Sequence, residues 1–310
     1  MALPEIIQQK IESLCESVPL STLKLEAEKL SDTYRNSKRG GIELLDNKVS
    51  TLAYIASRLP ATYSAISSVL LGVKETFDNL EVKTVIDVGA GPGTATIAIN
   101  NILGKKSVTL IERNPDMIEV GKQLLSELEC ECEWVQNDIK DFSKNADLII
   151  SAYMFNEMDE NAVKDLVQKL YTKADKALVI VDNGTKDAFS MMKIVRETLI
   201  SIGANILAPC ANESECQNEW CHFSARVGRT KLHKILKGGD APFEDEKFTY
   251  LVATKVPSEN HDRILRHPKI LKGRVELELC TKNGIEHKTI TKTQKEIFKI
   301  ARKSTWGETI

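Results

Sequence analysis

Three cysteines lie close together in a chain whose other cysteines are scattered. They are Cys210, Cys216 and Cys221, and the spacings between them are looser than the two-residue spacings typical of zinc ribbons. The total of seven cysteines is odd, and the sequence shows no export signal, so clustered thiols indicate metal binding or redox chemistry rather than disulfides. One more thiolate would complete a four-cysteine site.

The fourth ligand has to come from elsewhere in the chain. Cys280 ends an expected strand directly before a Lys-Asn-Gly turn, which is an exposed position from which a thiolate can reach a metal. Cys130 and Cys132 flank another expected strand and Cys15 lies on an apolar helical stripe, where cysteine usually acts as a small hydrophobic residue. Four soft thiolates suit either zinc or an iron–sulfur cluster, and the spacing does not choose between them.

A glycine-rich loop follows the first expected strand of the central region. Its glycines allow a ligand to approach the backbone, and the next helix offers free amide hydrogens. A dinucleotide fingerprint would need glycine at the position of Thr94, so NAD is the weaker alternative. The loop resembles the S-adenosylmethionine (SAM) loop of class I methyltransferases, in which the acidic residue serves the methionine amino end. The cofactor-binding candidates in this loop are Asp87, Gly89, Ala90, Gly91, Gly93 and Thr94.

The ends of the next two strands fit the same cofactor. Glu112, followed by Arg113, ends the second strand and is well placed to accept both ribose hydroxyls. The third strand leads to Asn137, Asp138 and Ile139, the usual position for adenine contacts in methyltransferases. Three correctly spaced strand ends therefore predict a SAM site.

The end of the fourth strand supplies the acceptor side of such a site. Ser151 is a further cofactor-binding candidate, and Tyr153 and Glu157 are candidates for catalysis. The stretch has neither the Asn-Pro-Pro-aromatic motif of amino-group methylation nor a cysteine for attack on a pyrimidine. The sequence predicts cofactor binding and leaves the catalytic residue open.

The elements that position these residues follow from hydrophobic periodicity. Residues 1–80 have the spacing of an N-terminal helical domain. From residue 81 to 202, short β-branched strands alternate with amphipathic helices, which predicts an α/β doubly wound sheet of the class I methyltransferase, Rossmann-like type. Residues 203–310 hold the cysteine cluster, closing strands of the sheet, a basic hairpin joined by Lys-Asn-Gly, and a short basic helix.

Positive charge gathers in three stretches although the net charge of the whole chain is only -2. Residues 222–239 and 263–275 contain five Lys and Arg each and no acid, and residues 288–303 contain six against one glutamate. Such polarisation is typical of a surface that faces a polyanion, although solvated helix faces would explain any one stretch. The candidates for RNA binding are Arg226, Arg229, Lys231, Lys234, Lys237, Arg266 and Lys299.

The chain resembles a known family over most of its length. The motifs are Trp220-Cys221-His222-Phe223-Ser224, the residues from Phe243 to Tyr250, Arg58-Leu59-Pro60-Ala61-Thr62-Tyr63, the glycine loop and Trp306-Gly307. They are similar to those of the mitochondrial small-ribosomal-subunit methyltransferase-like family, which has bacterial members. The resemblance implies a 4Fe–4S cluster on Cys210, Cys216, Cys221 and Cys280, and association with the small ribosomal subunit and its rRNA.

One departure from the family bears on activity. Relatives have Glu-Pro-Gly after the fifth strand, where this chain has Asp182-Asn183-Gly184. We therefore expect a ribosome assembly factor that binds SAM and rRNA, acting either as an rRNA methyltransferase or as an RNA-binding scaffold. The alternative is a small-molecule methyltransferase with a structural zinc site, which leaves the basic stretches unexplained.

The surroundings of the protein can also be estimated from the sequence. No apolar run approaches the ~20 residues of a membrane span, so we expect no membrane partner. The N-terminal stretch resembles neither a secretory signal nor an Arg-rich transit peptide. We expect a monomer in the cytoplasm, or in the mitochondrial matrix if the chain is a processed organellar protein.

Overall fold

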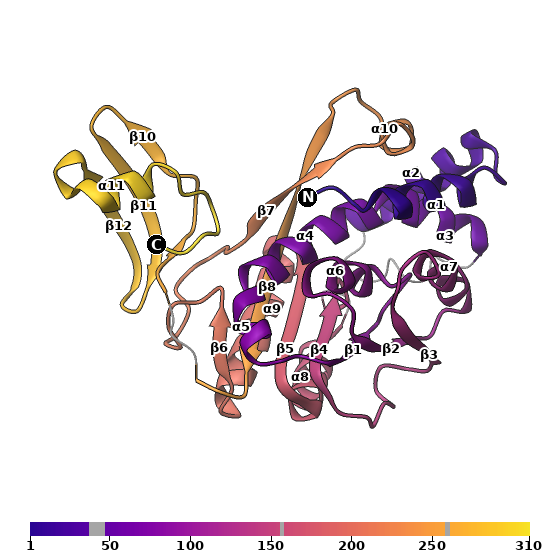
Figure 1. Cartoon of the computed structure of the whole chain (residues 1–310), viewed down its shortest axis with the longest axis horizontal. Coiled ribbons are helices and arrows are strands. Elements are labelled where there is room, and N and C mark those ends of the chain that lie inside the picture. The colour runs from indigo at the N-terminus through magenta and orange to yellow at the C-terminus, as the bar shows by residue number, and fades with distance from the viewer. Residues whose placement is uncertain (37–46, 156–157, 258–260) are drawn as a thin grey trace.

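A mixed eight-stranded sheet lies at the centre of the computed structural model, which describes residues 1–36, 47–155, 158–257 and 261–310 (Figure 1). The strand order is β3-β2-β1-β4-β5-β8-β6, and β7 pairs with β8 beyond the part of β8 that pairs with β6. Strands β1 to β5 are parallel to one another, and β8 is antiparallel to β5, β6 and β7. The strands are β1 (Thr84–Val88), β2 (Ser107–Glu112), β3 (Glu131–Gln136), β4 (Ala146–Ala152), β5 (Ala174–Asn183), β6 (Asn205–Ala208), β7 (Phe223–Gly228) and β8 (Phe243–Thr254).

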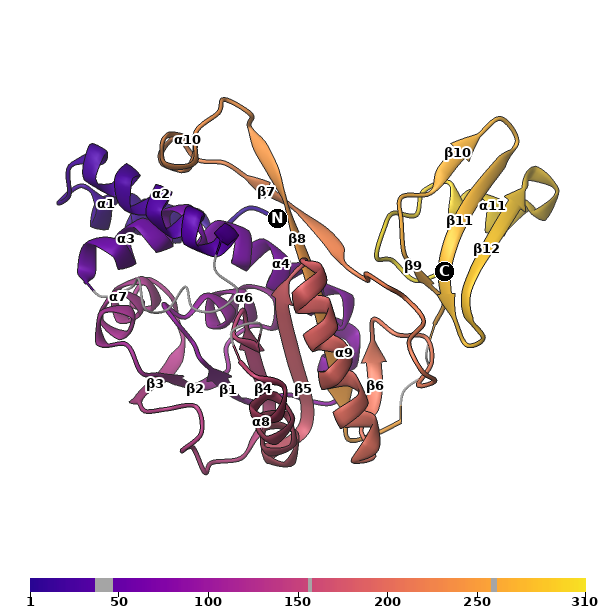
Figure 2. The ribbon, with the colours of Figure 1, turned by 180° about the vertical axis from the view of Figure 1, so that it is seen from behind.

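Helices cover both faces of this sheet. On one face α6 (Thr94–Leu103) and α7 (Pro115–Leu125) share a core with the N-terminal helices, and on the other α8 (Glu160–Lys173) and α9 (Lys186–Ser201) cover a second core (Figure 2). The inner strands are buried on both sides, as parallel strands with crossover helices must be. The strand order reverses direction between β1 and β4, which is where ligands bind in doubly wound sheets. The predicted Rossmann-like sheet is therefore confirmed.

The N-terminal helices are α1 (Glu5–Cys15), α2 (Leu20–Asn36), α3 (Lys48–Ser57), α4 (Leu59–Gly72) and α5 (Lys74–Asn79). Helix α4 is buried on nearly every side, because it packs between α6 and the β7–β8 pair. Its apolar residues belong to the same core as those of α6 and β1. The helical segment and the sheet thus share one hydrophobic core.

An extended arm rises from the sheet. It consists of β7, helix α10 (Lys231–Lys237) and the first half of β8, and α10 lies against α2 and α3 (Figure 1). The second half of β8 pairs with β5 and β6 inside the sheet. One continuous strand therefore joins the arm to the sheet edge.

The C-terminal module (residues 261–310) forms a second, antiparallel sheet set to one side of the first (Figures 1 and 2). It contains β9 (Arg263–Ile264), β10 (Lys269–Leu271), β11 (Arg274–Thr281), β12 (Gly284–Thr291), a 3-10 turn (Lys292–Gln294) and α11 (Lys295–Ala301). The expected hairpin is present, with Thr281 opposite Gly284 across the turn. The module has a small core of its own, which includes Leu277, Leu279 and Phe298.

Candidate cofactor site and cysteine cavity

The glycine loop leaves the end of β1 with three left-handed residues. Gly89, Gly91 and Gly93 have φ values of +68°, +54° and +81°. A side chain at Gly89 would meet the sulfur of Met154 at 2.9 Å and one at Gly93 would meet Leu125 at 3.0 Å, whereas one at Gly91 would meet nothing within 4 Å. The loop therefore presents bare, accessible backbone at Gly91. Ala90 and Thr94 are buried beneath it.

The carboxylate of Glu112 holds this loop in place. It accepts hydrogen bonds from the backbone N–H groups of Gly91, Arg113 and Asn114, each at 2.8 Å. A carboxylate has about four acceptor positions, so three bonds leave room for about one more. Glu112 therefore lies at the glycine loop, and three of its hydrogen-bond acceptor positions are already used by backbone N–H groups of the chain itself. Arg113 is exposed beside it.

Asp87 is buried at the end of β1, with 1% of its surface exposed. Its Oδ2 accepts from the backbone N–H of Thr96 at 3.2 Å and from the Thr96 hydroxyl at 2.9 Å. Burial raises the pKa of Asp87 to about 7, the two Thr96 hydrogen bonds oppose that rise, and the charge of Glu112 adds to it. The carboxyl group is therefore held against the first turn of α6, and its pKa is raised towards neutral pH.

The remaining cofactor candidates surround the same edge of the sheet. Asn137 donates its backbone N–H to the carbonyl of Glu112 at 3.2 Å, which connects the ends of β2 and β3. Asp138 is exposed, and Ile139 is half-buried against the core beneath α8. Ser151 lies at the end of β4, opposite Val88 of β1, and is fully buried. Its hydroxyl has no hydrogen-bond partner among the described residues.

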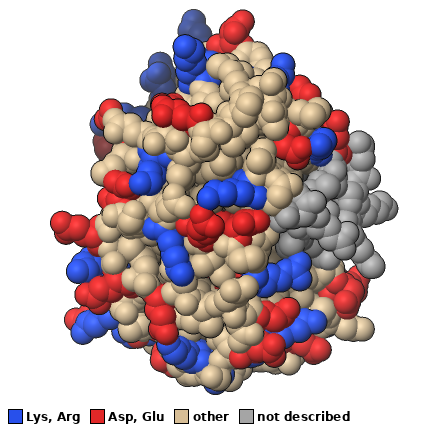
Figure 3. Space-filling view, turned by 90° about the vertical axis from the view of Figure 1, so that its right-hand side faces the viewer, with Lys and Arg blue, Asp and Glu red and all other residues tan. Residues whose placement is uncertain are grey.

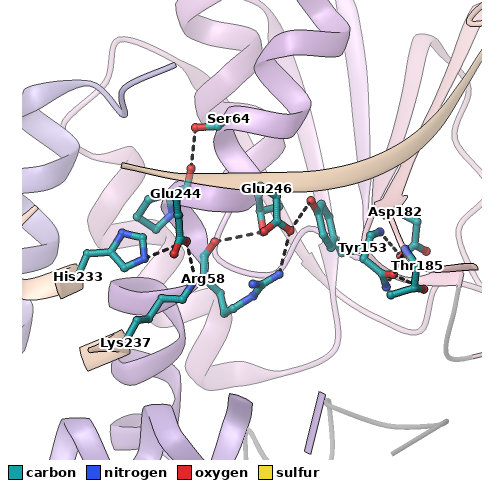
Figure 4. Close-up of polar contacts among 12 residues, drawn as sticks. Arg58, Ser64, Tyr153, Asp182, Thr185, His233, Lys237, Glu244 and Glu246 are labelled. Carbon is teal, nitrogen blue, oxygen red and sulfur yellow. Dashed lines mark hydrogen bonds and ion pairs between the residues drawn. The ribbon is translucent and has the colours of Figure 1, made fainter. Parts of the chain in front are cut away.

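Tyr153 is held in a network that the sequence did not reveal (Figure 4). Its hydroxyl donates to Glu246 Oε1 at 3.1 Å, and Arg58 Nη2 binds the same oxygen at 3.1 Å. The backbone of Tyr153 has a φ of +59°, a left-handed conformation that is strained for tyrosine. Burial raises the pKa of its hydroxyl well above the usual range, and the charge of Glu246 adds to that rise. Tyr153 is therefore a neutral hydrogen-bond donor.

The signal for this network was weak because its partners come from distant segments. Arg58 precedes α4 and Glu246 lies on the arm, and alternating acids at 244 and 246 on a strand were the one visible clue. The other catalytic candidate, Glu157, lies outside the described residues.

The four predicted ligands, Cys210, Cys216, Cys221 and Cys280, line one cavity of about 90 Å³. Each thiol interacts electrostatically with the other three. Burial raises the pKa of Cys210 to about 11, which the positive charge of Arg196 opposes, and burial also raises the pKa values of Cys221 and Cys280. Cys15, Cys130 and Cys132 do not line this cavity.

Donors and cations surround the thiols. The backbone N–H of Ala211 and the side chain of Asn212 reach the sulfur of Cys280, the latter at 4.0 Å. Arg196 lies beside Cys210, and its exposed fraction is 5%. Hydrogen bonds and positive charge of this kind stabilise thiolates and the sulfurs of metal clusters. In the described part of the chain, no group of three or more Cys, His, Asp or Glu residues is arranged so that it could hold a metal ion.

The basic stretches do not form one surface. The first lies on the arm next to α2 and the other two lie in the C-terminal module, on the far side of β7 (Figures 1 and 2). On the face over the N-terminal helices, positive and negative side chains are interspersed (Figure 3). Charge is thus distributed over separate parts of the molecule.

Several of the RNA-binding candidates have partners inside the chain. Glu244 binds Lys237 and lies 3.4 Å from the buried His233 and 4.0 Å from Arg229, which is 6% exposed (Figure 4). Burial alone would raise the pKa of Glu244, but hydrogen bonds from His233 and Lys237 lower it to about 2. This ion cluster fastens α10 to β8.

The other candidates divide into paired and unpaired cations. Arg226 pairs with Asp245 at 3.2 Å, and Lys299 pairs with Glu296 at 2.7 Å. Arg266 donates to the backbone carbonyls of Leu265 and Trp220. The ammonium groups of Lys231 and Lys234 have no ion-pair partner in the described ranges. These two lysines are the candidates best placed to meet a phosphate.

Known proteins are similar to this chain in sequence and in fold. Human ribosome assembly protein METTL17, a mitochondrial protein, is 24% identical over 290 residues, covering 83% of this chain and 62% of its own length. This chain thus spans less than two thirds of that relative. Two solved structures have TM-scores of 0.44 and 14% identity. The match to magnesium protoporphyrin IX methyltransferase from Synechocystis with SAM covers 73% of this chain and 90% of the methyltransferase chain. The match to the plantazolicin methyltransferase BpumL with SAH covers 81% of this chain and 99% of the BpumL chain.

In the described part of the chain, no helix is both long and apolar enough to cross a bilayer.

A family model matches residues 48–310, a range that contains the glycine loop, the Tyr153 network and all four cysteines of the cavity. The chain belongs to the family described as mitochondrial small ribosomal subunit Rsm22.

Proposed function

We propose that this protein is an assembly factor of the small ribosomal subunit that binds SAM and rRNA and carries a structural 4Fe–4S cluster. The observation that carries the proposal is the family match across residues 48–310. The human relative is named as a ribosome assembly protein, which supports the same role. The protein would then work where small subunits are assembled, in the bacterial cytoplasm or in the mitochondrial matrix, and as a monomer.

The cofactor half of the proposal rests on three features of the sheet edge. These are the open backbone at Gly91 after β1, the remaining acceptor capacity of Glu112 at the end of β2, and the partnerless hydroxyl of Ser151 near the end of β4. Glu112 would bind the ribose, Asn137 and Asp138 the adenine, and Asp87 the methionine amino group. SAM would supply an electrophilic methyl group there.

Calorimetry with SAM and its demethylated product tests this site. Glu112→Ala should weaken binding by about 1.5–3 kcal/mol, because a charge-assisted hydrogen bond to the ribose is lost. Ser151→Ala should weaken it less, and Ser107→Ala, at the opposite end of β2, should leave it unchanged. Equal affinities for wild type and Glu112→Ala would remove Glu112 from the site.

The cluster half rests on how the thiols are arranged. Zinc with four thiolates at about 2.3 Å needs sulfurs about 3.8 Å from one another around a single point. Here the four cysteines line one cavity of about 90 Å³, and this shared position supports their proposed role as ligands of one centre. A 4Fe–4S cluster would hold the C-terminal module to residues 210–221 through Cys280.

Anaerobic purification with iron, sulfide and visible absorption measured together tests the cluster. Replacing any of the four cysteines by Ser should remove the colour and weaken association with the small subunit. The matched control is Cys132→Ser, which should keep both, since Cys132 lies on β3 away from the cavity. Zinc at one equivalent, without iron, would overturn the cluster assignment.

The last question is whether the protein transfers a methyl group. The Tyr153 hydroxyl donates a hydrogen bond to Glu246. Where the methyl acceptor would bind, Tyr153 therefore supplies a hydrogen-bond donor rather than a free base. A deletion strain separates the two forms of the proposal. Loss of one rRNA methyl group would identify an enzyme, whereas failed subunit assembly with unchanged RNA modification would identify a scaffold.

A further inference from the structure

Trp220 lies at the edge of the central sheet, between the arm and the C-terminal module. Its indole Nε1 donates to the carbonyl of Gly184, directly after β5, at 2.9 Å. Its own carbonyl accepts from Arg266 of the module at 3.3 Å. The ring of His222 stacks on the indole, with centroids 4.0 Å apart and planes 21° apart. These contacts fix the plane of a large aromatic ring that remains partly exposed.

Two lysines from different elements place ammonium groups over this ring. The Nζ of Lys247, on β8, is 5.1 Å from the ring centroid, and the Nζ of Lys186, on α9, is 5.9 Å away. Both residues are exposed, and neither has an acidic partner among the residues that the structure describes. Exposed lysines elsewhere often pair with acids, as Lys144 does with Glu133 at 2.6 Å. The cations beside Trp220 are thus available to an anion.

The surface continues into the C-terminal module. The ring of Trp306 meets His222 edge-on at 5.0 Å, and the guanidinium of Arg266 lies 5.7 Å from the Trp306 centroid. His222 is 5% exposed, and its Nδ1 has no partner within the described ranges. Aromatic faces, cations and an unmatched polar nitrogen therefore gather at one place.

We propose that Trp220 stacks on an unpaired base of single-stranded RNA, while Lys186 and Lys247 contact the phosphates on either side of that base. Every base has a flat π-face, so stacking on a fixed aromatic ring recognises single strands with little regard to sequence. Lysine side chains are flexible and strongly hydrated, so the ammonium groups can move from the ring to phosphates at small cost. This role of Trp220 rests on the RNA association proposed above, and it places that association at Trp220, Lys186 and Lys247.

The position of this surface suits RNA better than a protein partner. Its exposed groups are cationic and aromatic, whereas the centre of a protein interface is depleted in charged residues. Lys247 also lies next to the anchor of Trp220, because its carbonyl accepts a hydrogen bond from Gly184 N–H at 2.8 Å and the Gly184 carbonyl accepts from the Trp220 indole.

The test uses the full chain, purified with its bound metal, and fluorescently labelled short single-stranded RNA in an anisotropy titration. Trp220→Leu should weaken binding about tenfold, while Trp220→Phe, which keeps an aromatic face, should retain most of it. Lys186→Glu and Lys247→Glu should each weaken binding and lower the salt dependence by about one unit of slope. The matched control is Lys122→Glu on α7, which makes the same charge change at an exposed lysine far from Trp220.

Folding is checked separately, because Trp220 neighbours Cys221. The two lysine variants alter exposed side chains only, so their melting temperatures and metal content should match wild type. Tight RNA binding that is unaffected by Trp220→Leu and by both lysine reversals would overturn this inference and leave the proposed function standing. Equal affinity for duplex RNA would overturn it too, since bases inside a duplex are stacked on one another and cannot stack on Trp220. A wild-type protein that binds no RNA would refute both proposals.

Discussion

Replacing Asp87 by Asn should change how the stability of the protein depends on pH. Asp87 is buried at the end of β1 and has a pKa of about 7, compared with 3.8 for an ordinary aspartate. Because the pKa is raised in the folded state, this group's contribution is fully present below about pH 4 and is lost as the pH rises through 7. Asparagine cannot ionise, and its oxygen can still accept from Thr96.

The size of the effect follows from the two pKa values. Each pH unit between them costs about 1.4 kcal/mol of unfolding free energy, and the loss levels off above the folded pKa. From pH 5 to pH 8 this carboxyl group alone should lower the stability of the wild type by about 3 kcal/mol. The stability of Asp87→Asn relative to wild type should rise by the same amount over that range.

Urea unfolding at a series of pH values, with wild type and variant measured side by side, gives the difference directly. Asp138→Asn is a suitable control because Asp138 is exposed at the same edge of the sheet. Parallel curves for wild type and Asp87→Asn from pH 5 to pH 8 would refute the reasoning, because they would show that burial of Asp87 carries no ionisation cost.

Two further changes test how the arm and the sheet edge are built. Gly184→Ala should lower the melting temperature measured by calorimetry, because the added methyl group would lie 2.6 Å from Cβ of Lys247 and 2.7 Å from the backbone N of Phe248. An unchanged melting temperature would contradict the close packing of the end of β5 against β8. Glu244→Gln should cost about 2 kcal/mol in urea unfolding, because Lys237 and the buried Arg229 side chain lose the negative charge opposite them. A loss below about 0.5 kcal/mol, the range of exposed pairs, would mean that this cluster does not fasten α10.

Much of the central sheet could be read from the sequence, because its signals are local. The strand expected to run into the glycine loop is β1, and the expected alternation of strands and helices over residues 81–202 is present from β1 to α9. Unbroken β-branched runs such as Val179-Ile180-Val181 indicate strands buried on both sides, which parallel sheets require. The glycine loop was equally visible, since its left-handed backbone needs glycine.

The arm and the Tyr153 network were not visible because their stabilising contacts are long-range. Strand β8 begins at Phe243, in a charged stretch whose acids pair with Arg58 and with α10. Nothing near Glu246 in the sequence identifies Arg58 as its partner. For the same reason, a basic stretch predicts positive charge but does not show that Glu244 already neutralises part of it.

The arrangement of the four cysteines has a consequence for the order of events during synthesis. Cys210, Cys216 and Cys221 leave the ribosome together, and Cys280, the one cysteine in the sequence of the C-terminal module, follows later. At typical rates of chain elongation, about 3–12 s separate the appearance of Cys221 from that of Cys280. During that interval the nascent chain has three closely spaced thiols and lacks both the fourth and the hairpin that carries it. Any centre that needs all four thiols, such as the proposed cluster, would therefore be completed only after the C-terminal module has been synthesised.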